Sequence, residues 1–326
     1  MPQTNPPEKV FITGANGFIG RQIASFYRAL GAEVAGVDIT ATPEWNVVAG
    51  NINHPQNWRD ALRNSDLVIH TAAIVSMNAT AKDAWHVNVS GTSQVLAAAT
   101  EAGVNRFVHI SSIAAFGWDF PDGVSEDYPL MPNGNTYCDS KIAAEHVVLA
   151  AHSRGDINCT IIRPGDVYGP ASRPWTLLPL ELIKSGQFLL PDKGQGIFSP
   201  VYIDDLVEGI SLAANTAAGS GEIFTLTSGE GVSCMTFFMH HAGWAKKTSI
   251  KTIPKGLAVV VTESAKNILH LAGKKTELGR GALDILSRHG TYSIDKARNI
   301  LGYTPKVSLD DGMKKTELWL RQQALI

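Results

Sequence analysis

Residues 13–20 read TGANGFIG, a glycine-rich turn between an apolar run and a segment of helical periodicity. The first glycine permits a tight turn, the second lets phosphates approach the backbone, and the third lets the helix lie close to a sheet. The start of the helix then offers unpaired backbone amides to a pyrophosphate. The stretch therefore predicts a dinucleotide site, and its expected contacts are Gly14, Gly17, Phe18, Ile19 and Gly20.

An acidic residue ends the next apolar run, at the distance that such a site needs. Asp38 follows Gly14 by 24 positions, where a carboxylate would accept hydrogen bonds from the adenine ribose. The carboxylate repels a 2′-phosphate, and Ile39 and Thr40 supply no cation to offset that repulsion. The pattern predicts NAD rather than NADP. The alternative is that Asp38 is an ordinary turn residue at a strand end.

Apolar runs alternate with helical segments over the first half of the chain. The expected strands are 10–13, 33–38, 67–70, 106–111 and 158–164, and the expected helices are 18–30, 82–102 and 136–152. Short apolar strands separated by helices are typical of a parallel sheet covered on both faces, with ligands beyond the carboxyl ends of the strands. The sequence therefore predicts an α/β fold, a Rossmann-type doubly wound parallel sheet with a smaller C-terminal substrate lobe.

The periodicity becomes irregular after Pro164, and this change suggests the domain boundaries. We expect a flexible tail, a dinucleotide-binding domain to which one later segment returns, and a substrate lobe built from two separate segments. In that order, these parts are residues 1–8, 9–168 with 197–228, and 169–196 with 229–326.

Two further loops have small or amide side chains, and the second of them follows an expected strand. Asn51 and Ile52 stand where a loop could cover the adenine, and Thr71, Ala72 and Ala73 would let the backbone pass beneath the phosphates. The alternative for both loops is simple packing.

Tyr137 and Lys141 are one helical turn apart, on one face of an expected helix. A free phenol titrates near pH 10, and a neighbouring ammonium would lower its pKa and make it usable as a base. Lys141 could also hydrogen-bond a nicotinamide ribose. The alternative is a solvated helix face, because this spacing is common by chance.

Hydroxyl and amide groups accompany this pair. Ser111 and Ser112 end an expected strand, where a hydroxyl could hold a substrate oxygen while the tyrosine exchanges its proton. Asn88 lies on an otherwise apolar helix face and would support the lysine or a water beside it. Its alternative role is a hydrogen bond that fixes helix packing.

Taken in order, these motifs resemble those of the extended short-chain dehydrogenases/reductases, the NAD-dependent epimerase/dehydratase superfamily. The likeness runs from about residue 10 to 228, with a weaker likeness at 290–302, and its nearest branch in outline is that of the 3β-hydroxysteroid dehydrogenases. The motifs are TGANGFIG, Asp38, NVSGT, HISSIAAFG, YCDSK, RPGDVYGP and VYIDDLVEG.

The resemblance implies a role for each candidate residue. Tyr137 would be the catalytic acid and base, Lys141 its activator, and Ser112 the hydroxyl that contacts substrate, since it meets the family's spacing to Gly117 and to the tyrosine. Ser111 would lie beside the nicotinamide. The loop expected along the carboxamide contributes Pro164, Gly165 and Val167. A homodimer through the two long helices is a further expectation, with contacts at Ala97, Ala98, Ala143, Ala144, Val147 and Val148.

The chain also departs from the family pattern. Asn51 replaces an aspartate at the adenine, and Phe116 replaces a frequent tyrosine. Phe198, Ser199 and Pro200 stand where nucleotide-sugar enzymes carry an Arg-Asp pair. Few cations are available for a diphosphate, the candidates being Arg173, Lys184 and Lys193. Aromatic and apolar residues could instead line a cavity or belong to the core of the lobe: Phe116, Trp118, Met131, Trp175 and Phe198.

The favoured function is therefore an NAD-dependent oxidoreductase that interconverts a secondary alcohol and a ketone on a small apolar molecule, steroid-like or aromatic. Two alternatives remain open. One is a nucleotide-sugar epimerase or dehydratase with tightly bound NAD, and the other is a catalytically silent NAD sensor.

Composition limits the kinds of partner and compartment that the sequence suggests. The net charge of −2 and the pI of about 6.5 argue against nucleic acid as a partner. Three widely spaced cysteines, Cys138, Cys159 and Cys234, suit a reducing compartment better than a disulfide framework or a metal site. A cytoplasmic location without a membrane span is expected. Residues 257–261, LAVVV, predict part of an amphipathic helix in the lobe, with a weak membrane contact as the alternative.

Overall fold

The computed structural model describes residues 6–271 and 279–326, and its centre is a seven-stranded sheet. All strand pairs in this sheet are parallel, in the order β11-β6-β5-β4-β1-β2-β3. The strands are β1 (Lys9–Thr13), β2 (Glu33–Asp38), β3 (Val47–Ala49), β4 (Leu67–His70), β5 (Arg106–Ile110), β6 (Asn158–Pro164) and β11 (Ile223–Leu226). The sheet confirms the Rossmann-type fold expected from the sequence, and its strand order reverses beside β1, where such folds bind ligands.

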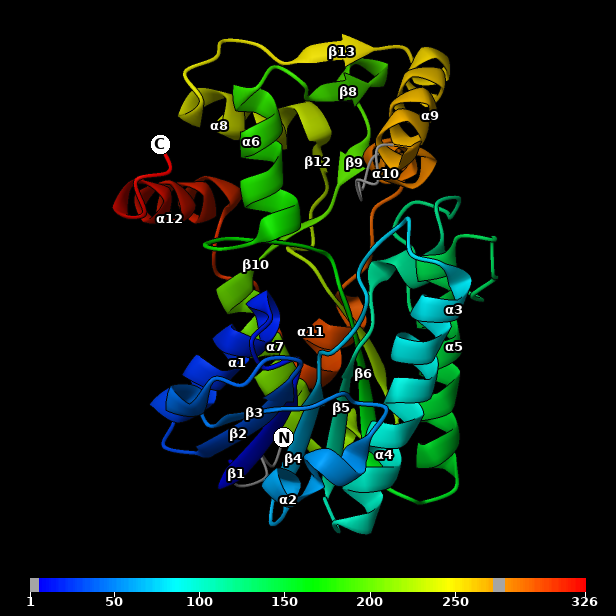
Figure 1. Cartoon of the computed structure of the whole chain (residues 1–326), viewed down its shortest axis with the longest axis vertical. Coiled ribbons are helices and arrows are strands. Elements are labelled where there is room, and N and C mark those ends of the chain that lie inside the picture. Colours follow the sequence, from blue (N-terminus) through cyan, green and yellow to red (C-terminus); the bar gives the residue numbers. More distant parts are fainter. Residues whose placement is uncertain (1–5, 272–278) are drawn as a thin grey trace.

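Helices cover both faces of this sheet (Figure 1). One layer contains α1 (Phe18–Ala29), α7 (Ile203–Asn215) and α11 (Asp295–Leu301). The other contains α2 (Arg59–Leu62), α4 (Thr92–Glu101) and α5 (Thr136–Ser153). Because strand side chains alternate, Val10 and Ile12 pack under the first layer and Phe11 under the second, and all three are fully buried. Burial on both faces explains why the strands read as continuous apolar runs.

The long helix expected at 82–102 is interrupted. It runs as α3 (Ala81–Ala84), a π-helical turn over Trp85–Gly91, and then α4. The Thr92 hydroxyl donates to the carbonyl of Asn88 at 2.6 Å within this turn. Such turns often occur at functional sites, and this one carries Asn88.

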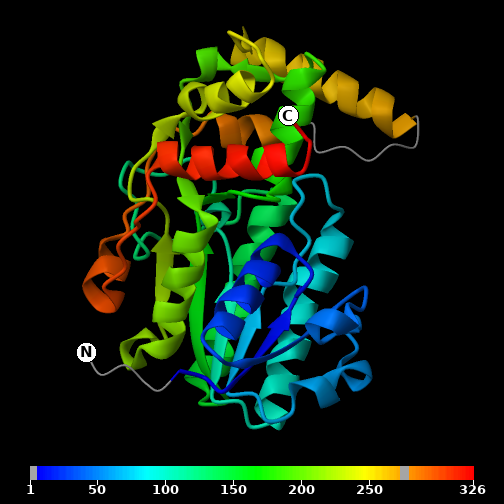
Figure 2. The ribbon, with the colours of Figure 1, turned by 90° about the vertical axis from the view of Figure 1, so that its left-hand side faces the viewer.

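The smaller lobe, expected to bind the substrate, lies beyond the carboxyl ends of the sheet strands (Figures 1 and 2). Its two-stranded ladders join β7 to β10, β9 to β12 and β8 to β13. The strands outside the main sheet are β7 (Asp166–Tyr168), β8 (Leu189–Pro191), β9 (Ile197–Phe198), β10 (Pro200–Tyr202), β12 (Val232–Ser233) and β13 (Lys251–Ile253). The helices of this region are α6 (Leu178–Lys184), α8 (Cys234–Trp244), α9 (Lys255–Leu271), α10 (Arg280–Leu286) and α12 (Leu309–Gln322).

Residues 257–261 lie on α9, a helix of the lobe. Ala258 faces inward, whereas the Leu257 and Val260 side chains are 54% and 62% exposed. In the described ranges, no helix has the length and apolar character that a bilayer crossing requires.

Three segments differ from the expected boundaries. Within 197–228, β11 joins the main sheet, but β9 and β10 pair outside it. Helix α11, expected in the lobe, packs on β11 and α7 because Ala297 and Leu301 are buried in the sheet core. Residues 1–5 of the expected tail lie outside the described residues, and Glu8 is fixed by its amide, which donates to Asp66 at 2.8 Å. The domain division as a whole stays a prediction.

The homodimer also stays a prediction, and only some of the residues expected at its interface are exposed. Ala98, Ala144 and Val148 are buried within the subunit's own core. Of the six positions expected at the interface, those with exposed surface are Ala97, Ala143 and Val147.

Candidate active site

The turn between β1 and α1 has the shape that a dinucleotide phosphate requires. Gly14 has φ +69°, a conformation that favours glycine, and its amide donates to the carbonyl of Val37 at 2.9 Å. A Cβ on Gly20 would lie 2.3 Å from the carbonyl oxygen of Gly14. Among the described residues, no side chain caps the N-terminus of α1, which begins at Phe18 after Gly17. The cradle therefore fits a pyrophosphate.

Asp38 lies beside this turn at the end of β2. Its carboxylate accepts from the amide of Asn16 at 2.9 Å and from the amide of Ile39 at 2.7 Å. An ionised carboxylate has about four acceptor positions, so it can still receive ribose hydroxyls. The position fits the expected ribose contact, and the two amides also give Asp38 a role in holding the turn.

The loop after β4 passes directly under the glycine turn. The Thr71 hydroxyl donates to the carbonyl of Thr13 at 2.7 Å, and the amide of Ala72 lies 2.8 Å from where a Cβ on Gly14 would be. Ala73 follows, half-buried. These small residues are thus placed where the backbone would run beneath the phosphates.

The loop after β3 is held mainly by packing. Ile52 is buried in the core with Trp58, and the Trp58 indole donates to the carbonyl of Asn51 at 2.8 Å. The side chain of Asn51 is exposed and accepts from the amide of Asn53 at 2.9 Å. A contact of Asn51 and Ile52 with the adenine remains a prediction.

Tyr137 and Lys141 occupy the inner face of the first turns of α5. Asn135 caps this helix, since its side-chain oxygen accepts from the amide of Tyr137 at 3.0 Å. The Lys141 ammonium donates to the carbonyl of Ile110 at 2.8 Å and lies 5.9 Å from the centre of the Tyr137 ring. Tyr137 is 6% exposed and Lys141 3%, so the alternative of a solvated helix face is wrong.

Burial dominates the electrostatics of this pair. It raises the pKa of Tyr137 to about 12, although a hydrogen bond with Ser112 acts in the opposite direction. It lowers the pKa of Lys141 to about 8, partly opposed by the Glu145 carboxylate. Desolvation by burial is thus the main influence on the pKa of Tyr137, and the expectation that Lys141 lowers this pKa in the complex with NAD stays a prediction.

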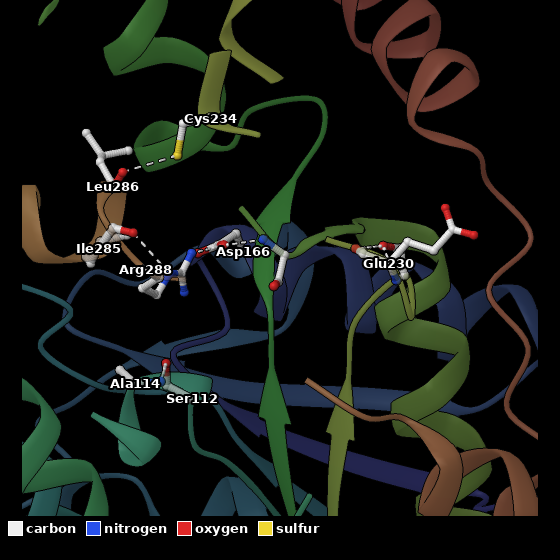
Figure 3. Close-up of polar contacts among 10 residues, drawn as sticks. Ser112, Ala114, Asp166, Glu230, Cys234, Ile285, Leu286 and Arg288 are labelled. Carbon is white, nitrogen blue, oxygen red and sulfur yellow. Dashed lines mark hydrogen bonds and ion pairs between the residues drawn. The ribbon is translucent and has the colours of Figure 1, made fainter. Parts of the chain in front are cut away.

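The two serines after β5 have different surroundings. The half-buried Ser112 hydroxyl accepts from the amide of Ala114 at 3.1 Å (Figure 3). It is also close enough to Tyr137 to act on the pKa of its phenol. Ser111 is buried, and its hydroxyl donates to Glu145 at 2.5 Å. Ser112 is thus placed beside the tyrosine, whereas the hydroxyl of Ser111, expected at the nicotinamide, points to Glu145.

Asn88 contacts the neighbour of the lysine rather than the lysine itself. Its amide nitrogen donates to the Ser140 hydroxyl at 2.9 Å and to the carbonyl of Ile74 at 3.1 Å, and its oxygen accepts from the amide of Ile74 at 2.7 Å. These bonds join the π-helical turn to α5 and to the loop after β4. Its alternative role in packing therefore accounts for its contacts in the free protein.

The loop after β6 is anchored to the lobe. The amide of Gly165 donates to the carbonyl of Leu226 at 2.9 Å, between buried Pro164 and Val167. Asp166 accepts from the amide of Ser199 at 2.9 Å and forms a buried ion pair with Arg288, which follows α10 (Figure 3). Sequence reasoning missed Arg288, because 122 residues separate it from its partner.

Sequence reasoning also missed the acidic residue below Lys141. Glu145 forms a bidentate, buried ion pair with Arg163 at 2.9 and 2.7 Å. The Arg163 guanidinium in turn lies 4.6 Å from the centre of the Phe116 ring. The spacing of Lys141 and Glu145, again one helical turn, was the available signal.

The aromatic residues expected around a cavity separate into different places. Phe198 is fully buried against Trp175 and Phe237, with ring centres 4.9 and 4.0 Å away. Met131 is 73% exposed. Trp118, in contrast, packs with Tyr137.

The candidate cations lie at the surface. Arg173 pairs with Glu181 at 3.7 Å, and Lys184 and Lys193 are exposed. Within the described ranges, no group of histidine, cysteine or acidic side chains could hold a metal ion.

Comparison with known proteins agrees with this geometry. The fold and site define an NAD-binding enzyme of the Rossmann type. The sequence model of the NAD dependent epimerase/dehydratase family matches residues 10–226, so the chain belongs to this family. It is an enzyme of the extended short-chain dehydrogenase/reductase type and its cofactor is NAD, as the sequence motifs indicated.

Individual relatives are distant but cover nearly the whole chain. A 4-hydroxy-2-methyl-3-oxo-4-farnesyl-3,4-dihydroquinoline-1-oxide ketoreductase of Stigmatella aurantiaca is 28% identical over 94% of both chains. A 3-beta-hydroxysteroid dehydrogenase of Mycolicibacterium neoaurum is 27% identical over 94% of this chain and 89% of its own. The solved structure of MoeE5 in complex with UDP-glucose and NAD has a TM-score of 0.78 and 24% identity, covering 97% of this chain and 99% of its own.

Proposed function

We propose that this enzyme interconverts a secondary alcohol and a ketone on a small apolar substrate, with Tyr137, Lys141 and Ser112 as the catalytic residues. The observation that carries the proposal is the burial of Tyr137 and Lys141, with half-buried Ser112 near them, beside one apolar cluster. Tyr137 packs with Ala114, Cys138, Met77 and Trp118, which offer no charge to a substrate. Two relatives with a ketoreductase and a steroid dehydrogenase name support the same substrate class.

Each residue has a definite task in this proposal. The Tyr137 oxygen takes the proton of the alcohol, and Ser112 donates a hydrogen bond to the developing ketone oxygen. Lys141 holds positive charge beside the phenolate, which burial alone would disfavour. NAD, when bound, accepts the hydride that leaves the carbon. Reduction follows the same path in reverse.

Net formation of NADH distinguishes the proposed reaction from that of an epimerase. Purified protein, NAD and a panel of steroid, aromatic and other apolar secondary alcohols should give net NADH, measured by its absorbance. Epimerisation returns the hydride to the same substrate and gives none. Conversion of a UDP-sugar without net NADH, together with inactivity toward every alcohol, would contradict the proposal.

Activity should depend on pH because alcohol oxidation needs a site that has already lost a proton. Oxidation needs the Tyr137 phenolate, which burial disfavours and which the positive charges of Lys141 and of bound NAD would favour. The kcat/KM for oxidation should therefore rise with pH through an ionisation below that of a free tyrosine, and the kcat/KM for reduction should fall through it. A profile that is flat from about pH 6 to 10 would exclude this role for the pair.

A further inference from the structure

Glu145 lies at the centre of a buried hydrogen-bond network directly below the catalytic pair. One carboxylate oxygen accepts from the Ser111 hydroxyl at 2.5 Å and from Nε of Arg163 at 2.9 Å. The other accepts from Nη2 of Arg163 at 2.7 Å. Both charged side chains are 2% exposed, so the network is closed to solvent.

This network connects the three elements that carry the proposed site. Glu145 comes from α5, one turn after Lys141, while Ser111 follows β5 and Arg163 lies on β6, next to the cofactor loop. Lys141 itself binds the carbonyl of Ile110, the residue before Ser111. A shift of the Glu145 carboxylate would thus move Ser111, at the end of β5, together with the neighbouring carbonyl of Ile110 that Lys141 binds.

The ionisable side chains around Lys141 differ in their effect on its charge. His109 from β5 and His70 from β4 are stacked at 5.4 Å, and burial lowers the pKa of both, that of His70 to about 3, so burial disfavours the charged form of each. Tyr137 is neutral as well in the free protein. Among the described residues, Glu145 is the one whose charge raises the pKa of Lys141.

Stability gives little reason for this ion pair. Burying two charges costs desolvation energy, and an apolar pair of similar size is often as stable or more so. The network is therefore better explained by what it does to the groups beside it.

We propose that Glu145, held by Arg163, is a positioning residue that keeps Lys141 charged and fixes the end of β5 at Ser111. The proposal rests on the proposed function for its catalytic meaning. Its effect on Lys141 is a property of the free protein and can be measured without turnover.

The test compares three variants with the parent protein. Glu145→Leu/Arg163→Leu removes both charges, Glu145→Gln removes one charge and keeps the shape, and Glu145→Asp keeps the carboxylate. The protein is labelled with ¹³C at lysine Cε, the Lys141 resonance is assigned by its loss in Lys141→Arg, and its titration is followed by NMR without cofactor. Thermal unfolding and the pH dependence of NAD affinity, by tryptophan fluorescence, are measured on the same samples.

We expect Lys141 to titrate lower by about one pH unit in Glu145→Gln, because a nearby carboxylate favours the ammonium form. The shift should be in the same direction but smaller in the double variant, which also removes the Arg163 cation. NAD affinity should then weaken at a correspondingly lower pH, while Glu145→Asp should resemble the parent. The melting temperature of the double variant should stay near that of the parent.

Unchanged titration of Lys141 in Glu145→Gln, or in the double variant if Glu145→Gln does not fold, would overturn the inference. A parent protein that oxidises no alcohol would refute the proposed function and leave the NMR result standing.

Discussion

Replacing Tyr137 with Phe should reduce turnover by about 10³-fold, since a positioned acid or base typically contributes about 10²–10⁴ to the rate. The substitution removes one hydroxyl from a ring packed against Trp118 and Cys138, so the fold and the glycine turn should be unaffected. NAD affinity should therefore remain near that of the parent. Steady-state NADH formation and NAD titration by fluorescence measure the two effects separately.

Tyr128→Phe is the matched control for this experiment. Tyr128 is a half-buried tyrosine of a separate cluster around Phe116 and Tyr292, and its loss of a hydroxyl should leave turnover unchanged. If Tyr137→Phe kept most of the parent's activity, Tyr137 would not be the acid and base. If neither Tyr137→Phe nor the Tyr128→Phe control turned over any substrate while both bound NAD, a silent NAD sensor would be the better account.

Replacing Gly20 with Ala should disrupt NAD binding, with a loss of affinity of up to about 100-fold. The added Cβ would lie 2.3 Å from the carbonyl oxygen of Gly14 and 3.1 Å from Cα of Ala15. Both are backbone atoms, so α1 must move away from the turn, at a cost of about 1–3 kcal/mol typical of overpacking. Affinity changes about tenfold for each 1.4 kcal/mol.

Gly243→Ala provides the control, because Gly243 is also helical and its Cβ would meet no heavy atom within 4 Å in the part of the chain that the structure describes. That variant should bind NAD as the parent does. NAD titration and thermal unfolding of both variants check the result. Parental affinity in Gly20→Ala would show that the phosphates bind elsewhere.

Much of the sheet could be predicted from local sequence. The strands at 33–38, 67–70 and 158–164 have the expected bounds, because strands buried on both faces are short apolar runs ended by turn residues. Tyr137 and Lys141 could likewise be selected by their spacing, and Ser112 by the resemblance to the family. Helical and strand geometry bring them together at one edge of the sheet.

The rest depends on contacts between distant residues. The pairing of Asp166 with Arg288 and the burial of Phe198 against Phe237 come from separate parts of the chain, and no local pattern marks them. The hydrophobic periodicity around Asn88 suits an ordinary helix and gives no sign of the π-helical turn found there. The Asp166–Arg288 pair and the π-helical turn could therefore not be predicted from the sequence.

The pKa of Tyr137 likewise depends on contacts that the local sequence does not show. Spacing placed Lys141 beside Tyr137 but gave no measure of how deeply the pair is buried. The desolvation that raises the pKa of Tyr137 to about 12 depends on that depth. The sequence therefore indicated the partners, whereas the depth of burial that raises the pKa of Tyr137 could not be predicted from it.

A crystal structure of the complex with NAD would test the central claim most directly. The account predicts that the nicotinamide lies beside Tyr137 and Ser112, with Nζ of Lys141 within hydrogen-bond reach, about 2.6–3.2 Å, of its ribose. A nicotinamide bound away from Tyr137, or a Tyr137 hydroxyl turned into solvent, would contradict it.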